Sequence, residues 1–183
     1  AMKMKSSLII ICLAVAVIMV SACGKFDRSK IAMPKIHFIT SDNLHSVICL
    51  DNTHTWIFGN YGTIFFSSDG GTTWNKQESG VNVLLGDASF VNKDEGWAVG
   101  VAGTVLHTSD AGKTWKLQKS NTEKDLLDVF FLDPQHGWAV GEQGTLIHTD
   151  DGGNTWASPL EPQDSAFNSV FFADLNSGWV VGE

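Results

Sequence analysis

Seven tryptophans mark a repeat in this chain of 183 residues. One set recurs every 41 residues and consists of Trp56, Trp97, Trp138 and Trp179. The other set has the same interval and consists of Trp74, Trp115 and Trp156. No insertion interrupts the spacing. A fixed period of this length indicates a repeat architecture, in which each unit buries its hydrophobic face against its neighbours.

Each unit holds four short strand-like segments, joined by turns rich in Gly, Asp and Asn. In the third unit we expect strands at residues 126–132, 137–140, 145–149 and 155–158. The first strand has equivalents at 44–50, 85–91 and 167–173, and we expect it near a central axis, buried on both faces. A period near 40 with four strands is typical of a β-propeller blade.

The sequence therefore predicts an all-β protein. We expect residues 41–183 to form a β-propeller with four-stranded antiparallel blades of 41 residues. About three and a half blades of seven are present, which predicts a truncated gene product. An assembly of two chains into one ring is the alternative, since an unclosed propeller exposes strand edges.

A second motif, Ser/Thr-x-Asp-x-Gly-x-Thr-Trp, ends at each tryptophan of the second set. Its Asp can accept hydrogen bonds from turn amides, its Gly can adopt a positive φ, and its Trp can pack against the neighbouring blade. We expect these residues to be structural, because no copy matches a calcium-binding loop. The three copies comprise Ser67, Asp69, Gly71, Thr73 and Trp74, then Thr108, Asp110, Gly112, Thr114 and Trp115, then Thr149, Asp151, Gly153, Thr155 and Trp156.

Composition and charge exclude two classes of protein. Aromatic residues make up 10% of the chain and charged residues 17%, which argues against a disordered chain. The 20 acidic and 12 basic residues give a formal net charge of −8. A nucleic-acid binder needs clustered Lys and Arg instead, so we expect no nucleic acid as a partner.

Residues 1–22 have the features of a secretory signal peptide. Lys3 and Lys5 precede an apolar run at 8–20, which is shorter than the ~20 residues of a membrane-spanning helix. The four residues that end in Cys23 resemble a bacterial lipobox, whose Cys is lipidated after cleavage. An ordinary signal peptide with an incidental Cys is the alternative.

Lipidation of Cys23 predicts that residues 23–40 form a tether. It also predicts an exported protein, anchored at the outer face of the cytoplasmic membrane or at the outer membrane, in the periplasm or at the cell surface. Cys12 lies in the signal segment and Cys23 would carry lipid. Cys49 is then left with no partner for an intramolecular disulfide.

The Gly-Trp-Ala-Val-Gly motif, the Gly-Thr-hydrophobic-hydrophobic-His-Thr segment and the second motif together resemble the photosystem II stability/assembly-factor family and its non-photosynthetic bacterial relatives. The second motif is the Asp-box, or bacterial neuraminidase repeat. The resemblance implies a seven-bladed, membrane-anchored, non-enzymatic scaffold with a protein partner and no cofactor or metal. Photosynthetic members carry an arginine-rich patch, whereas this chain has no Arg after Arg28. That difference favours a general binding or assembly lipoprotein.

A glycan-binding protein or a glycoside hydrolase is the rival interpretation, because sialidases and some glucanases also carry Asp-boxes. Sialidases need an arginine cluster and a Tyr nucleophile, which Arg28 and Tyr61 do not supply. Glucanases need two carboxylates about 5–10 Å apart. The candidate carboxylates are Asp87, Asp128, Asp94 and Glu142.

Two features argue against catalysis and against a metal site. Asp87 and Asp128 occupy one repeat position, which favours a structural role for both. His107 and His148 also share a repeat position, and we expect them to be strand residues rather than metal ligands.

Overall fold

A computed structural model describes residues 43–161 and 163–183. The expected signal peptide, the lipidation site Cys23 and the expected tether lie outside the described residues. Within the described ranges, no helix has both the length and the apolar character needed to cross a membrane.

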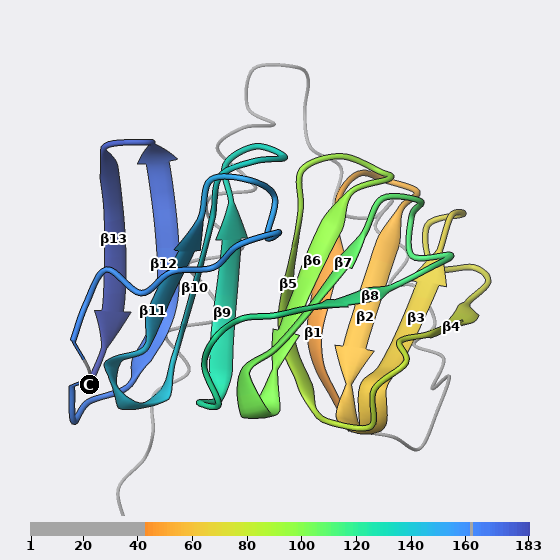
Figure 1. Ribbon diagram of the computed structural model, residues 1–183. Helices are drawn as coiled ribbons and strands as arrows, with labels where there is room; N and C mark the ends of the chain where they lie inside the picture. Colours follow the sequence, from red (N-terminus) through yellow and green to blue (C-terminus); the bar gives the residue numbers. More distant parts are fainter. Residues whose placement is uncertain (1–42, 162) are drawn as a thin grey trace, which may run out of the picture. The chain divides into compact units, whose positions relative to one another are not determined.

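The described chain forms four antiparallel sheets, one for each 41-residue unit (Figure 1). We call them blades 1 to 4. Blade 1 contains β1 (Leu44–Cys49), β2 (Thr55–Gly59), β3 (Thr63–Ser67) and β4 (Asn75–Glu78). Blade 2 contains β5 (Leu85–Phe90), β6 (Gly96–Gly100), β7 (Thr104–Thr108) and β8 (Lys116–Gln118). Blade 3 contains β9 (Leu126–Phe131), β10 (Gly137–Gly141) and β11 (Leu146–Thr149), and blade 4 contains β12 (Phe167–Asp174) and β13 (Ser177–Gly182).

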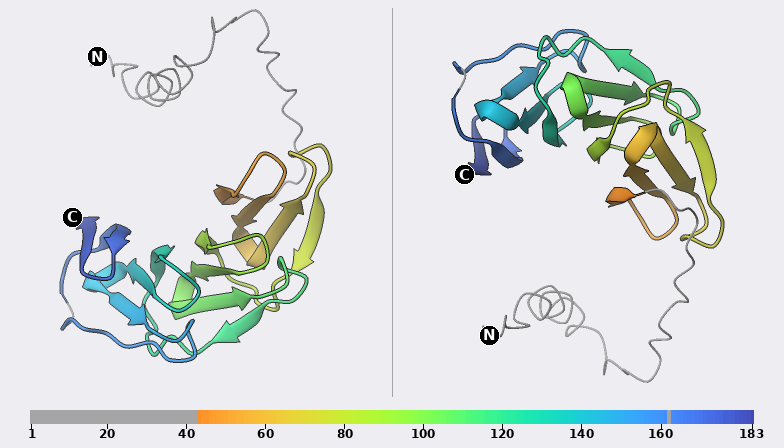
Figure 2. Two further views of the ribbon diagram at one scale, coloured as in Figure 1. Left: turned by 90° about the horizontal axis from the view of Figure 1, so that it is seen from above. Right: turned by 90° about the horizontal axis from the view of Figure 1, so that it is seen from below.

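The blades fan out around the side on which their first strands lie. β1, β5, β9 and β12 contact one another in sequence from blade to blade, and Figure 2 shows them along the concave side of the arc. Within each sheet the strands follow in sequence order. Blades that converge at their first strands and diverge at their last ones are the arrangement of a β-propeller. The predicted fold class, a partial β-propeller, is therefore correct.

Short turns connect the second and third strands of blades 1 to 3. They are η2 (Asn60–Gly62), η3 (Val101–Gly103) and η4 (Glu142–Gly144). The middle residues, Tyr61, Ala102 and Gln143, have φ values of 57, 55 and 54°, and the Gly that follows each is also left-handed. Two successive residues with positive φ give a tight hairpin whose twist suits the flanking strands.

The first strands are less buried than the sequence predicts. They are not buried on both faces. In β9 buried and more accessible residues are interspersed, and β1 is exposed or intermediate throughout. The second strand has the predicted burial instead, since every residue of β6 and β10 is buried. The physical reason is position: a second strand has strands on both sides and a blade on each face, whereas a first strand lies at the edge of its sheet.

The prediction of a fourth strand in blade 3 is also wrong. Only one bridge forms, between His148 and Ala157, where residues 155–158 were expected to pair over their length. In blade 2, Gln118 pairs with Val105, but the equivalent position in blade 3 is Pro159. Proline has no N–H to donate, so pairing ends after Ala157.

The core consists of three hydrophobic clusters, one at each junction between successive blades. The cluster between blades 2 and 3 contains Trp97, Val99, Leu126, Phe131 and Trp156, all at most 4% exposed. Equivalent clusters join blades 1 and 2 and blades 3 and 4. Each unit therefore completes its core with residues of the next one, as the repeat predicts.

Candidate functional site

The Asp-box turns follow the third strand of blades 1, 2 and 3 and have the same hydrogen bonds. In blade 2, Thr108 Oγ1 accepts from Gly112 N at 2.8 Å and donates to Asp110 Oδ1 at 2.9 Å. Asp110 also accepts from Thr114 N at 2.8 Å and from Thr114 Oγ1 at 2.7 Å. Blade 1 makes the same bonds with Ser67, Asp69, Gly71 and Thr73, and blade 3 with Thr149, Asp151, Gly153 and Thr155.

These bonds keep the Asp-box carboxylates ionised. Hydrogen bonds from the backbone and then the side chain of Thr73 lower the pKa of Asp69 to about 2. In Asp110 burial opposes the same set of bonds, but the pKa is still lowered. The pKa of Asp151 is lowered mainly by the backbone and side chain of Thr155. Each carboxylate already accepts several bonds within its own turn, so its position is that of a turn-stabilising group.

A glutamine of the preceding blade holds each of the last two Asp-boxes. Gln118 in β8 donates from Nε2 to Gly152 O at 2.9 Å, and its Oε1 accepts from Trp156 Nε1 at 3.3 Å. Gln77 in β4 makes the same pair of bonds to Ala111 O and Trp115 Nε1, at 2.8 and 3.2 Å. We call this contact the glutamine clamp.

Sequence reasoning missed the glutamine clamp. Gln77 and Gln118 are 41 residues apart, and that spacing was the available signal, but both lie in short polar strands. No described blade precedes blade 1, so no glutamine of the described residues clamps Trp74. Its Nε1 donates instead to Gly71 O of its own turn at 3.1 Å.

The other tryptophan set stacks across the blade junctions. Trp97 lies against Phe131 of blade 3, with ring centroids 3.5 Å apart and an interplanar angle of 6°. Trp56 stacks on Phe90 at 4.0 Å, and Trp138 stacks on Phe172 at 3.7 Å. No described blade follows Trp179, whose ring partner is Phe171 of its own blade at 6.4 Å, and 61% of its surface is exposed.

The glycine of the Gly-Trp motif makes room for this stack. A Cβ on Gly137 would lie 2.3 Å from the ring of Phe131, its partner in the sheet. In blade 1, where Thr55 replaces the glycine, the facing residue is Cys49 instead of Phe. Cys49 is exposed and is a free cysteine.

The four candidate carboxylates lie in three different parts of the fold. Asp87 in β5 and Asp128 in β9 are hydrogen-bonded to each other across the junction of blades 2 and 3. Asp94 lies in the β5–β6 hairpin, 3.9 Å from Lys93 Nζ. Glu142 lies in η4, at the turn between β10 and β11. The structure therefore brings together only one pair of the four.

The histidines at the shared repeat position have different surroundings. His107 stacks on Trp97 at 4.8 Å, and its Nε2 lies 3.4 Å from Glu95 Oε1. Burial is the main cause that lowers the pKa of His107. His148 Nε2 lies 3.1 Å from Asp150 Oδ2. No group of three His, Cys, Asp or Glu side chains within residues 43–161 and 163–183 could hold a metal ion.

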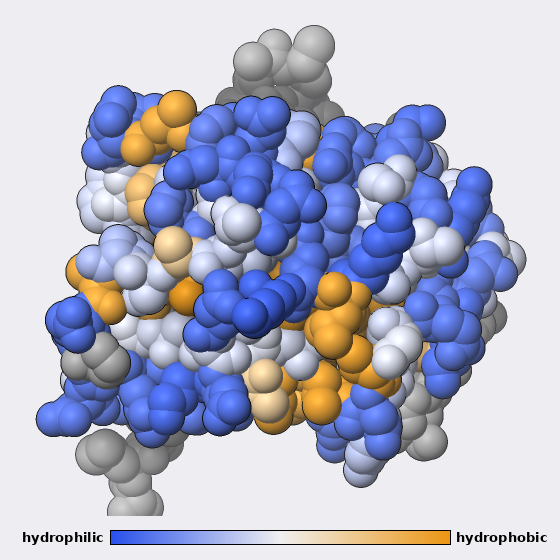
Figure 3. Space-filling view, in the orientation of Figure 1, coloured by the Kyte–Doolittle hydropathy of each residue, from blue (hydrophilic) through white to orange (hydrophobic). Residues whose placement is uncertain are grey.

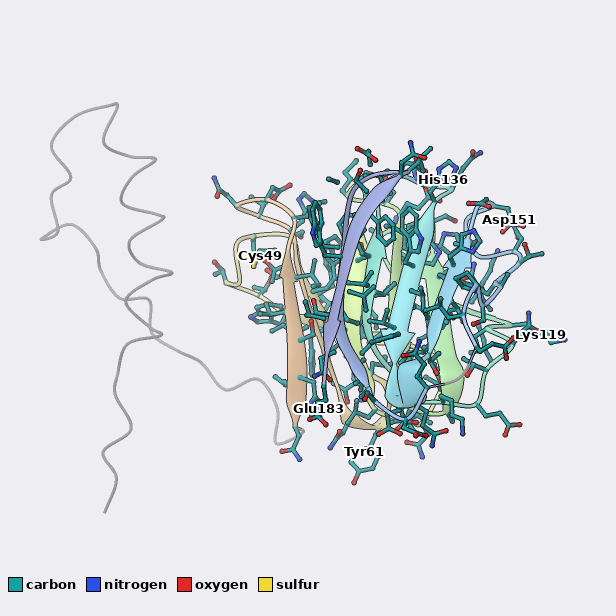
Figure 4. The ribbon with its side chains drawn as sticks, turned by 90° about the vertical axis from the view of Figure 1, so that its left-hand side faces the viewer. Cys49, Tyr61, Lys119, His136, Asp151 and Glu183 are labelled. Atoms are coloured by element: carbon teal, nitrogen blue, oxygen red, sulfur yellow. The ribbon has the colours of Figure 1, made fainter. Side chains whose placement is uncertain are left out.

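One face of the blades is mainly polar (Figure 3). The face seen in Figure 3 is largely hydrophilic, with apolar side chains in separate patches. Figure 4 shows His136 and Asp151 at one end of the sheets and Tyr61 and Glu183 at the other. A cavity of about 240 Å³ is lined by Asn121, Lys124, Gln143, Ile147 and Leu160, among others. None of the described residues that line this cavity is an Asp, Glu, His or Cys.

A comparison with known protein families shows the family of this chain. The family model described as photosynthesis system II assembly factor YCF48 matches residues 28–120 and 114–183. This chain belongs to the YCF48 family. The predicted resemblance is therefore confirmed, and a comparison with curated proteins gave no match.

Solved structures of YCF48 share the fold of this chain. A structure described as YCF48 bound to D1 peptide is 22% identical, with a TM-score of 0.65 over 74% of this chain and 45% of that one. YCF48 from Cyanidioschyzon merolae is 24% identical, with a TM-score of 0.59 over 67% of this chain and 41% of that one. The chain thus spans less than half the length of these YCF48 structures.

An enzyme shares the fold as well. The crystal structure of an ancestral GH74 enzyme is 15% identical, with a TM-score of 0.63 over 76% of this chain and 22% of that one. At this identity the likeness concerns the propeller fold alone.

Proposed function

We propose that this chain is a non-enzymatic propeller scaffold that binds a protein partner during assembly of a complex at a membrane surface. The observation that carries the proposal is the YCF48 family match over residues 28–183. The structure described as YCF48 bound to D1 peptide supports a protein as the kind of partner. The Asp-box carboxylates support it too, because each is engaged within its own turn.

The charge of the blades suggests what the partner presents. Residues 43–183 contain six lysines, no arginine and eighteen Asp or Glu residues. A surface of this sign attracts a basic segment and repels an acidic one. We therefore propose a partner with a basic or neutral docking segment, in contrast to recognition through an arginine-rich patch.

We also propose that the scaffold is exported and anchored by lipid on Cys23. The basic, apolar and small-residue segments that precede Cys23 support this proposal. Two or more acyl chains give stable anchoring, whereas one chain gives marginal binding. Mass spectrometry of the amino-terminal peptide should show acylated Cys23, and Cys23→Ser should release the protein from the membrane fraction. An unmodified Cys23 in membrane-associated protein would contradict the anchor.

The scaffold function is tested by cross-linking the full chain in its native membranes, identifying the cross-linked protein and measuring its binding in purified form. We expect saturable binding that weakens as salt increases, because opposite charges are screened. Lys119→Gln, which removes an exposed positive charge, serves as the control and should not weaken binding. Failure of the purified pair to bind would contradict the proposal.

A glycoside hydrolase is the second candidate, favoured by the fold it shares with a GH74 enzyme. Retaining and inverting glycosidases hold their two carboxyl groups at least about 5 Å apart. Asp87 and Asp128 are in hydrogen-bonding contact, which is too close for that chemistry. Release of reducing sugar from a soluble glucan, abolished by Asp87→Asn, would favour the enzyme over the scaffold.

A further inference from the structure

A chain of hydrogen bonds crosses all three blade junctions through the first strands. Ser46 Oγ in β1 donates to Asp87 Oδ1 in β5 at 2.7 Å. Asp87 is hydrogen-bonded to Asp128 in β9, and Asp128 Oδ2 accepts from Val170 N in β12 at 2.7 Å. The carboxyl pair is thus the central link of a chain that joins four blades.

The contact between the two carboxyl groups requires a proton. Ionised carboxylates only accept hydrogen bonds, so a hydrogen bond between two of them needs one proton on the pair. The outer partners reinforce this arrangement, because Ser46 and Val170 occupy one acceptor oxygen on each side. Two unprotonated carboxylates in contact would repel each other at the centre of the chain of bonds.

We propose that Asp87 and Asp128 share one proton and that this proton is a pH-sensitive link between blades 2 and 3. When the proton leaves to solvent, both groups are charged, the hydrogen bond is lost and the junction loosens. The link goes beyond the scaffold function and does not depend on it.

The environment of Asp87 agrees with this geometry. Burial and then the hydrogen bond with Asp128 raise the pKa of Asp87 to about 7. Other elements packed against β5 carry His45 and Cys49 in β1, Tyr61 in η2 and Asp128 in β9, while β2 and β6 carry no titratable side chain. Of these groups, Asp128 is the one whose charge acts on the pKa of Asp87.

The raised pKa of Asp87 sets the sign of the effect of pH on folding stability. The pKa of Asp87 is higher in the folded state than in the unfolded state, so the folded state binds more protons between the two values. The stabilisation is complete below the unfolded value of about 4 and is lost as the pH rises through about 7. The lowered pKa of His107 has the opposite effect, since acidification destabilises the fold there.

The Asp87→Asn variant tests whether the shared proton causes the pH dependence of stability. An Asn side chain can donate to the Asp128 carboxylate and accept from Ser46 at any pH. Asp87→Asn should therefore keep the chain of bonds without a titratable proton. Asp94→Asn is the matched control, because Asp94 is an exposed aspartate of the same blade.

The test uses the full chain and two readouts. Infrared spectra should show a protonated carboxyl group at about pH 6 that titrates near neutral pH and is absent from Asp87→Asn and from Asp128→Asn. Relative to Asp87→Asn, the thermal midpoint of the parent protein should fall by about 5 °C or more between about pH 5 and pH 9. Asp94→Asn should behave like the parent protein.

Two results would overturn the proposal. One is a folded protein whose carboxyl groups are all ionised at about pH 6. The other is a protonated carboxyl signal that persists in both asparagine variants, because the proton would then lie elsewhere.

Discussion

Trp97 of blade 2 and Phe131 of blade 3 lie face to face, with their ring centroids 3.5 Å apart. The same contact recurs one repeat earlier and one repeat later. Trp97 and Phe131 are both at most 4% exposed. The stack therefore links the 41-residue period directly to the packing of one blade on the next.

Trp97→Ala should destabilise the protein by about 3–5 kcal/mol, because it leaves a large cavity between blades 2 and 3. Trp179→Ala changes the same repeat position in blade 4, where 61% of the side chain is exposed, and should cost much less. Denaturant unfolding of both variants gives the comparison. Equal losses would mean that stacking on the next blade contributes little.

Gln118→Ala should destabilise the protein by about 1–3 kcal/mol. The substitution removes the acceptor of Trp156 Nε1, which belongs to a buried residue, and one donor to Gly152 O, which also accepts from Trp97 Nε1. Gln135→Ala is the control, since Gln135 is exposed. The free energy of unfolding measures both. A Gln118→Ala variant as stable as the control would show that the glutamine clamp is not needed.

Gly112→Ala should cost more than Gly80→Ala, although both glycines have a positive φ, 79 and 75°. A Cβ on Gly112 would lie 2.1 Å from Gln77 Oε1, whereas a Cβ on Gly80 meets nothing within 4 Å. Gly80→Ala should cost about 1–2 kcal/mol for its backbone conformation. An additional loss in Gly112→Ala would report the displaced clamp, and equal losses would argue against it.

Acid should weaken the Asp-box turns. The pKa of Asp110 is lowered in the folded state, so its contribution to stability is present above the unfolded value of about 4 and is lost as the pH falls below it. Asp110→Asn should therefore unfold with a smaller dependence on pH in this range than the parent protein. Acid titration followed by tryptophan fluorescence measures the effect. An unchanged acid transition would contradict the role of the Asp110 carboxylate.

The sequence predicts the repeat well because the same contacts recur at every junction. Trp97, Phe131 and Gly137 each have counterparts 41 residues away, so their spacing carries the fold. The missing fourth strand of blade 3 depends on a single departure from the repeat, Pro159, which the spacing of the tryptophans does not reveal.

The carboxyl pair shows a different limit. Asp87 and Asp128 occupy one repeat position, but the spacing does not by itself reveal their contact. Equivalent residues of first strands come together only because those strands converge at the concave side of the fan. The sequence predicts first strands near the axis, and that prediction is the available signal for the pair.

The most direct test of the account is a double-mutant cycle between Trp97 and Phe131, with denaturant unfolding of the two single alanine variants and the double variant. We predict a coupling energy of about 0.5–1.5 kcal/mol or more, because the rings stack across the blade junction. The same cycle between Trp97 and Phe172, which stacks on Trp138, should be additive. Additive losses for Trp97 and Phe131 would contradict the packing of successive repeats as propeller blades.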